Sequence, residues 1–91
     1  MNKKLGSFKL NDQELIILDT GSWKGSKPPY RVFTANKPYQ YVSGLYPISD
    51  GLYCFDDRKH GYIFNLDSLE VVETVTTSEF LKYRESCLSC V

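Results

Sequence analysis

The sequence has few of the side chains that perform catalysis. It contains a single histidine, His60, within the string Asp56-Asp57-Arg58-Lys59-His60-Gly61, which is typical of a solvated hairpin loop. General acid–base or nucleophilic catalysis needs a base held beside a second reactive group, and no such combination stands out. We therefore expect a protein that is not an enzyme and that carries no cofactor.

Long apolar runs are also absent. The longest is Leu15-Ile16-Ile17-Leu18, far short of the roughly 20 residues that cross a bilayer as a helix. The start, Met1 to Gly6, resembles the charged region of a signal peptide, but Lys9, Asp12 and Glu14 interrupt any apolar stretch after it. We expect no membrane association and no export by that route.

Cysteine is scarce and odd in number, with Cys54, Cys87 and Cys90. An odd count is not the even framework of a disulfide-stapled secreted domain, so a reducing cytoplasm fits best. The final Cys-x-x-Cys has the spacing of half a zinc site, and Cys54 and His60 would complete four ligands. A small zinc-stabilised domain is thus one alternative, and buried or unpaired thiols without any metal are the other.

The chain has 91 residues, which predicts one compact domain over 1–91. Short runs rich in Val, Ile, Tyr and Phe are separated by turn residues and predict strands. The connections are too short for parallel crossovers, so we expect an antiparallel meander of about six or seven strands, forming a curved sheet or a small barrel. The expected strands are Leu5 to Leu10, Glu14 to Leu18, Tyr30 to Thr34, Tyr39 to Tyr46, Gly51 to Phe55, Gly61 to Leu66 and Leu69 to Val75.

Helical character is confined to the end of the chain. Thr76 precedes Glu79 by three residues, which is the spacing of a capping box. Phe80, Tyr83 and Cys87 then follow at helical spacing and predict the buried face of one C-terminal helix. The fold class is therefore α+β, and mainly β.

The charges cancel overall but are unevenly spread. Eleven basic and eleven acidic side chains give a net charge of zero, so the chain as a whole lacks the field of a general nucleic-acid binder. However, residues 20–49, here called the acid-free window, contain no Asp or Glu, four basic residues and six of the thirteen aromatic ones. This segment is a candidate binding surface.

The connection from Thr20 to Pro29 is the longest in the chain and carries the only tryptophan. Long ordered loops in small domains are often functional, and Trp, Tyr and Arg are frequent anchors of protein interfaces. We therefore expect a protein partner as the first choice, with the lysines as steering charges at the rim. The expected partner-binding residues are Trp23, Lys24, Lys27, Tyr30, Arg31 and Lys37.

Two other interpretations of the same residues stay open. Aromatic faces stack on unpaired bases while Lys and Arg neutralise phosphates, so the acid-free window also fits a single-stranded nucleic acid or a nucleotide. Alternatively, its aromatics are ordinary strand residues, and the acidic second half of the chain forms the interface instead. Small size and missing catalytic groups suggest an inhibitor or accessory factor from a phage or mobile element. The sequence leaves the oligomeric state open.

Overall fold

The computed structural model describes residues 2–89 and is mainly β, with eight antiparallel strands and one C-terminal helix. The strands form two four-stranded sheets, each a simple meander, and neither is closed into a barrel. This confirms the expected mainly β, antiparallel fold with one C-terminal helix. The strand number is eight rather than six or seven, and the strands form two sheets rather than one curved sheet or a barrel. The backbone divides into two compact units, Met1–Leu45 and Tyr46–Val91, each of which contains one sheet.

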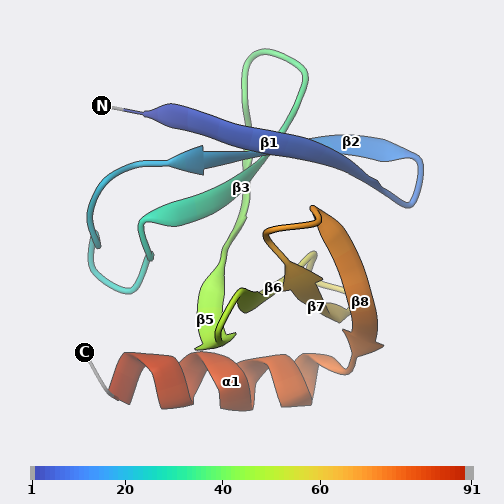
Figure 1. Cartoon of the computed structure of the whole chain (residues 1–91). Coiled ribbons are helices and arrows are strands. Elements are labelled where there is room, and N and C mark those ends of the chain that lie inside the picture. The colour runs from blue at the N-terminus through green and yellow to red at the C-terminus, as the bar shows by residue number, and fades with distance from the viewer. Residues whose placement is uncertain (1, 90–91) are drawn as a thin grey trace. The chain divides into compact units, whose positions relative to one another are not determined.

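The first unit holds β1 (Lys3–Leu10), β2 (Gln13–Asp19), β3 (Tyr30–Thr34) and β4 (Tyr41–Gly44), paired in that order (Figure 1). Asn11 and Asp12 join β1 to β2 and both have positive φ, as a two-residue type I′ turn requires. The central strand β2 carries four consecutive buried residues, Leu15 to Leu18. Since neighbouring side chains point to opposite faces, both faces of this sheet are covered along β2.

The second unit holds β5 (Tyr46–Ser49), β6 (Leu52–Asp56), β7 (Gly61–Asn65), β8 (Glu70–Val75) and α1 (Thr77–Ser89). Cys54 pairs with Ile63 and Phe55 with Tyr62, so Cys54 and Ile63 lie on one face of the sheet and the aromatic residues on the other. Tyr46 and the buried Phe80 meet edge to face with ring centroids 5.9 Å apart, so α1 packs on the Cys54 face of this sheet. Figure 1 shows α1 running beneath β5, β6 and β7.

The start of α1 is the capping box that the sequence predicts. The Thr76 hydroxyl accepts a hydrogen bond from the Glu79 N–H at 3.1 Å, and Glu79 Oε1 accepts one from the Thr76 N–H at 3.3 Å. Gly61 lies where the helix approaches the sheet closely, because a Cβ at that position would meet the Phe80 Cβ at 2.7 Å. Within residues 2–89, no helix is long and apolar enough to cross a membrane.

Candidate binding surface

The loop between β2 and β3 is closed at its base by hydrogen bonds. The N–H and the hydroxyl of Thr20 both donate to the carbonyl of Pro29, at 2.9 and 2.8 Å. Asp19 Oδ1 accepts from the N–H of Gly21 at 2.9 Å, and this local turn directs the chain out of β2. The loop is therefore held in a defined conformation from its first residues.

Arg31 ties the same loop to β3. Its Nε donates to the Pro28 carbonyl at 2.9 Å and its Nη2 to the Ser22 carbonyl at 3.3 Å. The Pro28 side chain between these contacts is fully buried. Arg31 was expected to anchor a partner, and in the structure at least two of its five N–H donors instead hold the loop against the sheet.

The tip of the loop is a two-residue hairpin. Lys24 and Lys27 exchange backbone hydrogen bonds of 2.9 and 3.0 Å, and Gly25 has a φ of 61° at the first turn position. A two-residue turn with a positive φ only at its first position is a type II′ turn, and that position favours glycine. As a result the two lysines lie directly opposite one another in this hairpin, and both are exposed. Like charges in directly opposite positions repel one another.

Two exposed tyrosines lie on the segment that enters β4. Lys27 Nζ lies 4.5 Å from the centroid of the Tyr41 ring, and Lys37 Nζ lies 5.8 Å from that of Tyr39. Thr34 and Gln40 exchange hydrogen bonds of 2.9 Å, so the backbone stays extended between the tyrosines and places them on one side. Their exposed fractions are 44% for Tyr39 and 38% for Tyr41.

Together these side chains form what we call the basic aromatic surface. Its three lysines are exposed, so their charges are accessible to a partner. Trp23 at its edge and Tyr30 at the loop exit are half-buried. Its members are Trp23, Lys24, Lys27, Lys37, Tyr39 and Tyr41.

Sequence reasoning included Tyr39 and Tyr41 in the acid-free window but left them out of the expected partner-binding residues, because it assigned them to strand packing. Phe33 does have that role, since it is half-buried and meets the Tyr41 ring edge to face at 5.7 Å. The two tyrosines differ because β4 is the last strand of its sheet. The sequence does contain a sign of this exposure. The alternation Tyr39-Gln40-Tyr41 directly after Pro38 is typical of a half-exposed strand at the edge of a sheet.

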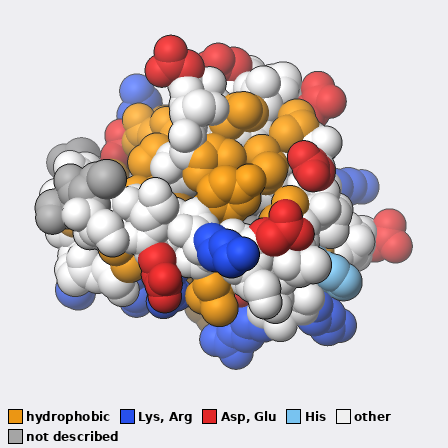
Figure 2. Space-filling view, turned by 90° about the horizontal axis from the view of Figure 1, so that it is seen from below, with side chains coloured by type: hydrophobic (Ala, Val, Ile, Leu, Met, Phe, Trp, Pro, Cys, Tyr) orange, Lys and Arg blue, Asp and Glu red, His pale blue; other side chains and the backbone are white. Residues whose placement is uncertain are grey.

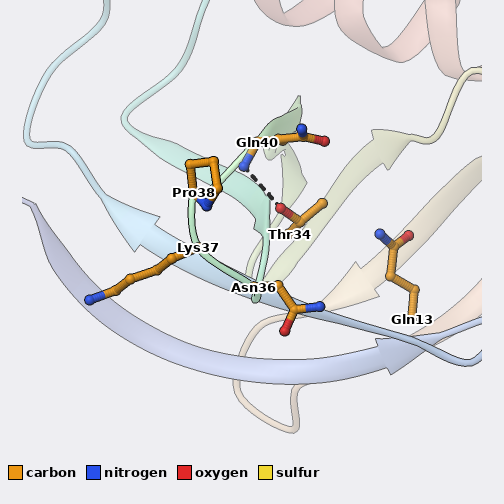
Figure 3. Close-up of a pocket in the computed structure, with 6 residues that line it drawn as sticks. All are labelled: Gln13, Thr34, Asn36, Lys37, Pro38 and Gln40. Atoms are coloured by element: carbon orange, nitrogen blue, oxygen red, sulfur yellow. Dashed lines mark hydrogen bonds between the residues drawn. The ribbon is translucent and has the colours of Figure 1, made fainter.

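An open hollow of about 240 Å³ lies at the turn between β3 and β4. Figure 3 shows its polar lining, with the Lys37 side chain directed away from the other labelled residues. Amide groups suit hydrogen bonding, but the lining contains no carboxylate, histidine or cysteine that would support catalysis. The lining residues are Gln13, Thr34, Asn36, Lys37, Pro38 and Gln40.

The four suggested zinc ligands are only partly described. Cys54 is fully buried on β6, whereas His60 is exposed in the β6–β7 loop, and the pale-blue imidazole is visible at the surface in Figure 2. Burial, then repulsion from Cys87 and Asp56, raises the pKa of the Cys54 thiol to about 12, which opposes the thiolate that zinc needs. Cys90 lies outside the described residues. Among residues 2–89, no group of three or more potential ligands is close enough to hold a metal ion.

Comparison with known proteins adds no assignment. The chain matches no protein-family model, no characterised protein and no solved structure. Any functional inference must therefore come from the geometry of its own residues.

Proposed function

We propose that this chain is a non-enzymatic binding protein that attaches to the acidic surface of a partner protein through its basic aromatic surface. The observation that supports this best is the arrangement around Tyr41, where an ordered loop places the Lys24–Lys27 pair beside an exposed ring. Tyrosines supply apolar contact area with a polar tip, and the lysines supply charge. An acidic partner relieves the repulsion between the two lysines.

Preorganisation of the loop favours this function. A flexible loop loses conformational entropy when it binds, and each immobilised side chain costs about 0.5–1.5 kcal/mol. Here Thr20 and Arg31 already fix the loop backbone in the free protein. The binding energy of the partner is then spent on contacts rather than on ordering the loop.

The distribution of charge also favours an acidic partner. The first unit, Met1–Leu45, contains seven basic and three acidic side chains, and the second, Tyr46–Val91, contains four basic and eight acidic ones. The zero net charge of the chain thus hides a surplus of four positive charges in the unit that carries the loop. Such a field steers an acidic partner toward the basic aromatic surface.

We place this binding in the cytoplasm, where a small inhibitor or accessory factor meets its target. The thiol of Cys54 is free, which suits a reducing compartment.

The proposal is tested by affinity capture from the host, with three versions of the protein. We expect wild type to retain a specific partner that is lost with Lys27→Glu/Tyr41→Ala and kept with Lys9→Glu/Ser7→Ala, a matched change on β1. Circular dichroism establishes that all three are folded. If the first variant retains every partner of wild type, the basic aromatic surface is not the interface.

A single-stranded nucleic acid is the second candidate ligand. It is favoured by the two lysine–tyrosine pairs, since each offers a ring on which a base stacks and a cation for the adjoining phosphate. Binding of a labelled oligonucleotide would weaken steeply as salt increases and would be lost with Tyr39→Ala/Tyr41→Ala. Absence of binding at low salt eliminates this candidate.

A further inference from the structure

The polar hollow at the turn between β3 and β4 has a concentration of one chemical group. Three of its six lining residues carry a carboxamide, and all three are exposed. Gln13 is the first residue of β2, Asn36 lies in the turn after β3, and Gln40 directly precedes β4. All belong to the first unit, and polar groups that converge on a concave surface from separate segments are typical of a ligand site.

The turn itself does not depend on these carboxamides. An asparagine that closes a turn accepts backbone N–H groups, as the Asn65 side chain does from Asp67 and Ser68 at 2.9 and 3.2 Å. The β3–β4 turn is closed differently, because the Thr34 N–H donates to the Gln40 carbonyl and the Gln40 N–H to the Thr34 hydroxyl oxygen, both at 2.9 Å. Turn formation therefore does not explain the carboxamides of the hollow.

The positive charge and the aromatic ring beside the hollow face another way. Figure 3 shows the Lys37 ammonium on one side of the turn and the three amide groups on the other. This ammonium lies 5.8 Å from the centroid of the Tyr39 ring. Side chains alternate along an extended segment, so Gln40 faces the hollow whereas Tyr39 faces the basic aromatic surface. The hollow shares Lys37 with that surface but offers uncharged groups to a ligand.

These groups determine the class of ligand. A carboxamide offers an N–H donor and a carbonyl acceptor side by side, and the Thr34 hydroxyl, which accepts from Gln40, keeps its own proton to donate. A hard cation prefers carboxylates, which the described lining residues do not supply. A phosphate prefers charged donors directed at it, whereas the Lys37 ammonium is directed away. A neutral sugar fits, because each of its hydroxyls both donates and accepts.

We propose that this hollow binds a neutral saccharide, with the amides of Gln13, Asn36 and Gln40 hydrogen-bonded to adjacent ring hydroxyls. The Pro38 ring, which also lines the hollow, supplies an apolar surface for a C–H face of the sugar. A volume of about 240 Å³ is below the roughly 300–1,000 Å³ of sites for drug-sized ligands, so the hollow takes about one sugar ring. This site goes beyond the proposed partner binding and does not depend on it.

The first test is a titration followed by two-dimensional ¹H–¹⁵N NMR of the whole chain. The probes are glucose, galactose, mannose and N-acetylglucosamine, each added alone. Since every hydrogen bond to the sugar replaces one to water, we expect a dissociation constant of about 1–10 mM for the best of the four. Its saturable shifts should include the side-chain N–H₂ signals of Gln13, Asn36 and Gln40. If none of the four sugars shifts these signals saturably, the proposal is wrong.

Two further probes test the chemistry of recognition. Cyclohexanol has a six-membered ring with one hydroxyl and should not shift the same signals, because it lacks the adjacent hydroxyls that a carboxamide pairs with. Adenine is the second probe, since Asn and Gln side chains also recognise the edge of this base. Saturable shifts with cyclohexanol, or with adenine and not with any sugar, would overturn the assignment to a saccharide.

Substitution identifies the binding groups. Gln13→Ala/Asn36→Ala removes two of the three amides and should weaken binding of the best sugar at least about tenfold. Gln13→Glu/Asn36→Asp keeps the shape but loses both N–H₂ donors, and it should also bind more weakly than wild type. Unchanged affinity in either variant, once circular dichroism has shown that it is folded, contradicts the proposal.

The matched control is a double substitution on the basic aromatic surface. Lys24→Ala/Lys27→Ala should keep the wild-type affinity for the sugar, because neither residue lines the hollow. A loss of sugar binding in this folded variant would place the saccharide on the basic aromatic surface and not in the hollow. If the amide variants do not fold, the wild-type titration still decides, since shifts centred on residues other than those of the hollow overturn the proposal.

Discussion

The ammonium group of Lys27 lies over the ring of Tyr41, 4.5 Å from its centroid. A cation in this position is attracted by the electron-rich face of the ring, by about 0.5–1 kcal/mol at exposed sites. The contact joins a residue of the β2–β3 loop to one of β4. The geometry of the loop therefore determines whether charge and aromatic area meet on one surface.

Arg31 is expected to control that geometry. In Arg31→Lys the planar fork that reaches the Pro28 and Ser22 carbonyls is replaced by a single ammonium, which cannot reproduce both hydrogen bonds. The free energy of unfolding should fall by about 1–3 kcal/mol, and amides of residues 21–28 should exchange faster in hydrogen–deuterium exchange. Lys9→Ala, an exposed change on β1, serves as control. Unchanged exchange in the loop would show that Arg31 does not hold it.

Removing the cap of α1 should destabilise the second unit. Thr76→Ala loses the hydroxyl that accepts from the Glu79 N–H, which typically costs about 0.5–2 kcal/mol. Thr77→Ala, one residue later and also exposed, is the matched control because it keeps the capping box. Urea unfolding of both variants measures the difference. Equal stabilities would mean that the box contributes nothing.

Gly61→Ala should be more damaging than its small size suggests. The new methyl group would lie 2.7 Å from the Phe80 Cβ and 2.9 Å from Val75 Cγ2, so α1 must move away from the sheet. Overpacking of this kind costs about 1–3 kcal/mol. Thermal unfolding should show a lower midpoint for this variant but not for Ser7→Ala on the exposed part of β1. A wild-type midpoint for Gly61→Ala would mean that α1 is not packed closely on β7.

The stability of the second unit should depend on pH through Asp57. Burial alone would raise the pKa of this carboxyl, but the N–H groups of His60 and Lys59 and the Tyr62 hydroxyl donate to it and hold the pKa below its ordinary value. A lowered folded-state pKa means that the stabilisation is complete above the unfolded-state pKa of about 4 and is lost as the pH falls through the folded-state value.

Asp57→Asn provides the measurement because it removes the titration at nearly constant shape. We expect wild type to exceed the variant in its urea midpoint at pH 7, and the gap to shrink as the pH falls to about 2. Asp67→Asn, an exposed carboxylate in the β7–β8 turn that accepts no hydrogen bond from Tyr62, is the comparison. A gap that is independent of pH would show that the charge of Asp57 is not what stabilises the loop.

The elements of the fold were largely predictable because their signals are local. The short runs rich in Val, Ile, Tyr and Phe and the Thr76 capping box each act within a few residues and appear in the structure as expected. The stretch expected as one strand, Tyr39 to Tyr46, is instead divided between β4 and β5, which belong to different sheets. Gly44 stands just before that division at Leu45, but a glycine inside a strand pattern also fits a continuous strand with a bulge. The division depends on which strands pair at long range.

The composition of the candidate surface could be read from the sequence, but the contacts of its residues could not. The acid-free window pointed to the lysines and the loop because charge and loop length are properties of the sequence, and their role in binding stays a prediction. The loop-binding role of Arg31 and the exposure of Tyr39 and Tyr41 arise from tertiary contacts. Residue type alone therefore assigned an anchor role to Arg31 and a packing role to the tyrosines.

The two described cysteines should differ sharply in reactivity. Cys54 is fully buried against α1 and its pKa is raised to about 12, mainly by that burial and further by Cys87, whereas Cys87 itself is half-buried. Only the thiolate reacts with iodoacetamide, so roughly one Cys54 thiol in ten thousand is reactive at pH 8. We expect label at Cys87 in the native protein, and at Cys54 only after unfolding. The experiment uses a Cys90→Ser background, so that label on the C-terminal peptide reports Cys87. In Cys87→Ser, Cys54 should stay protected because burial is the larger cause; rapid labelling of Cys54 in either protein would contradict this assignment.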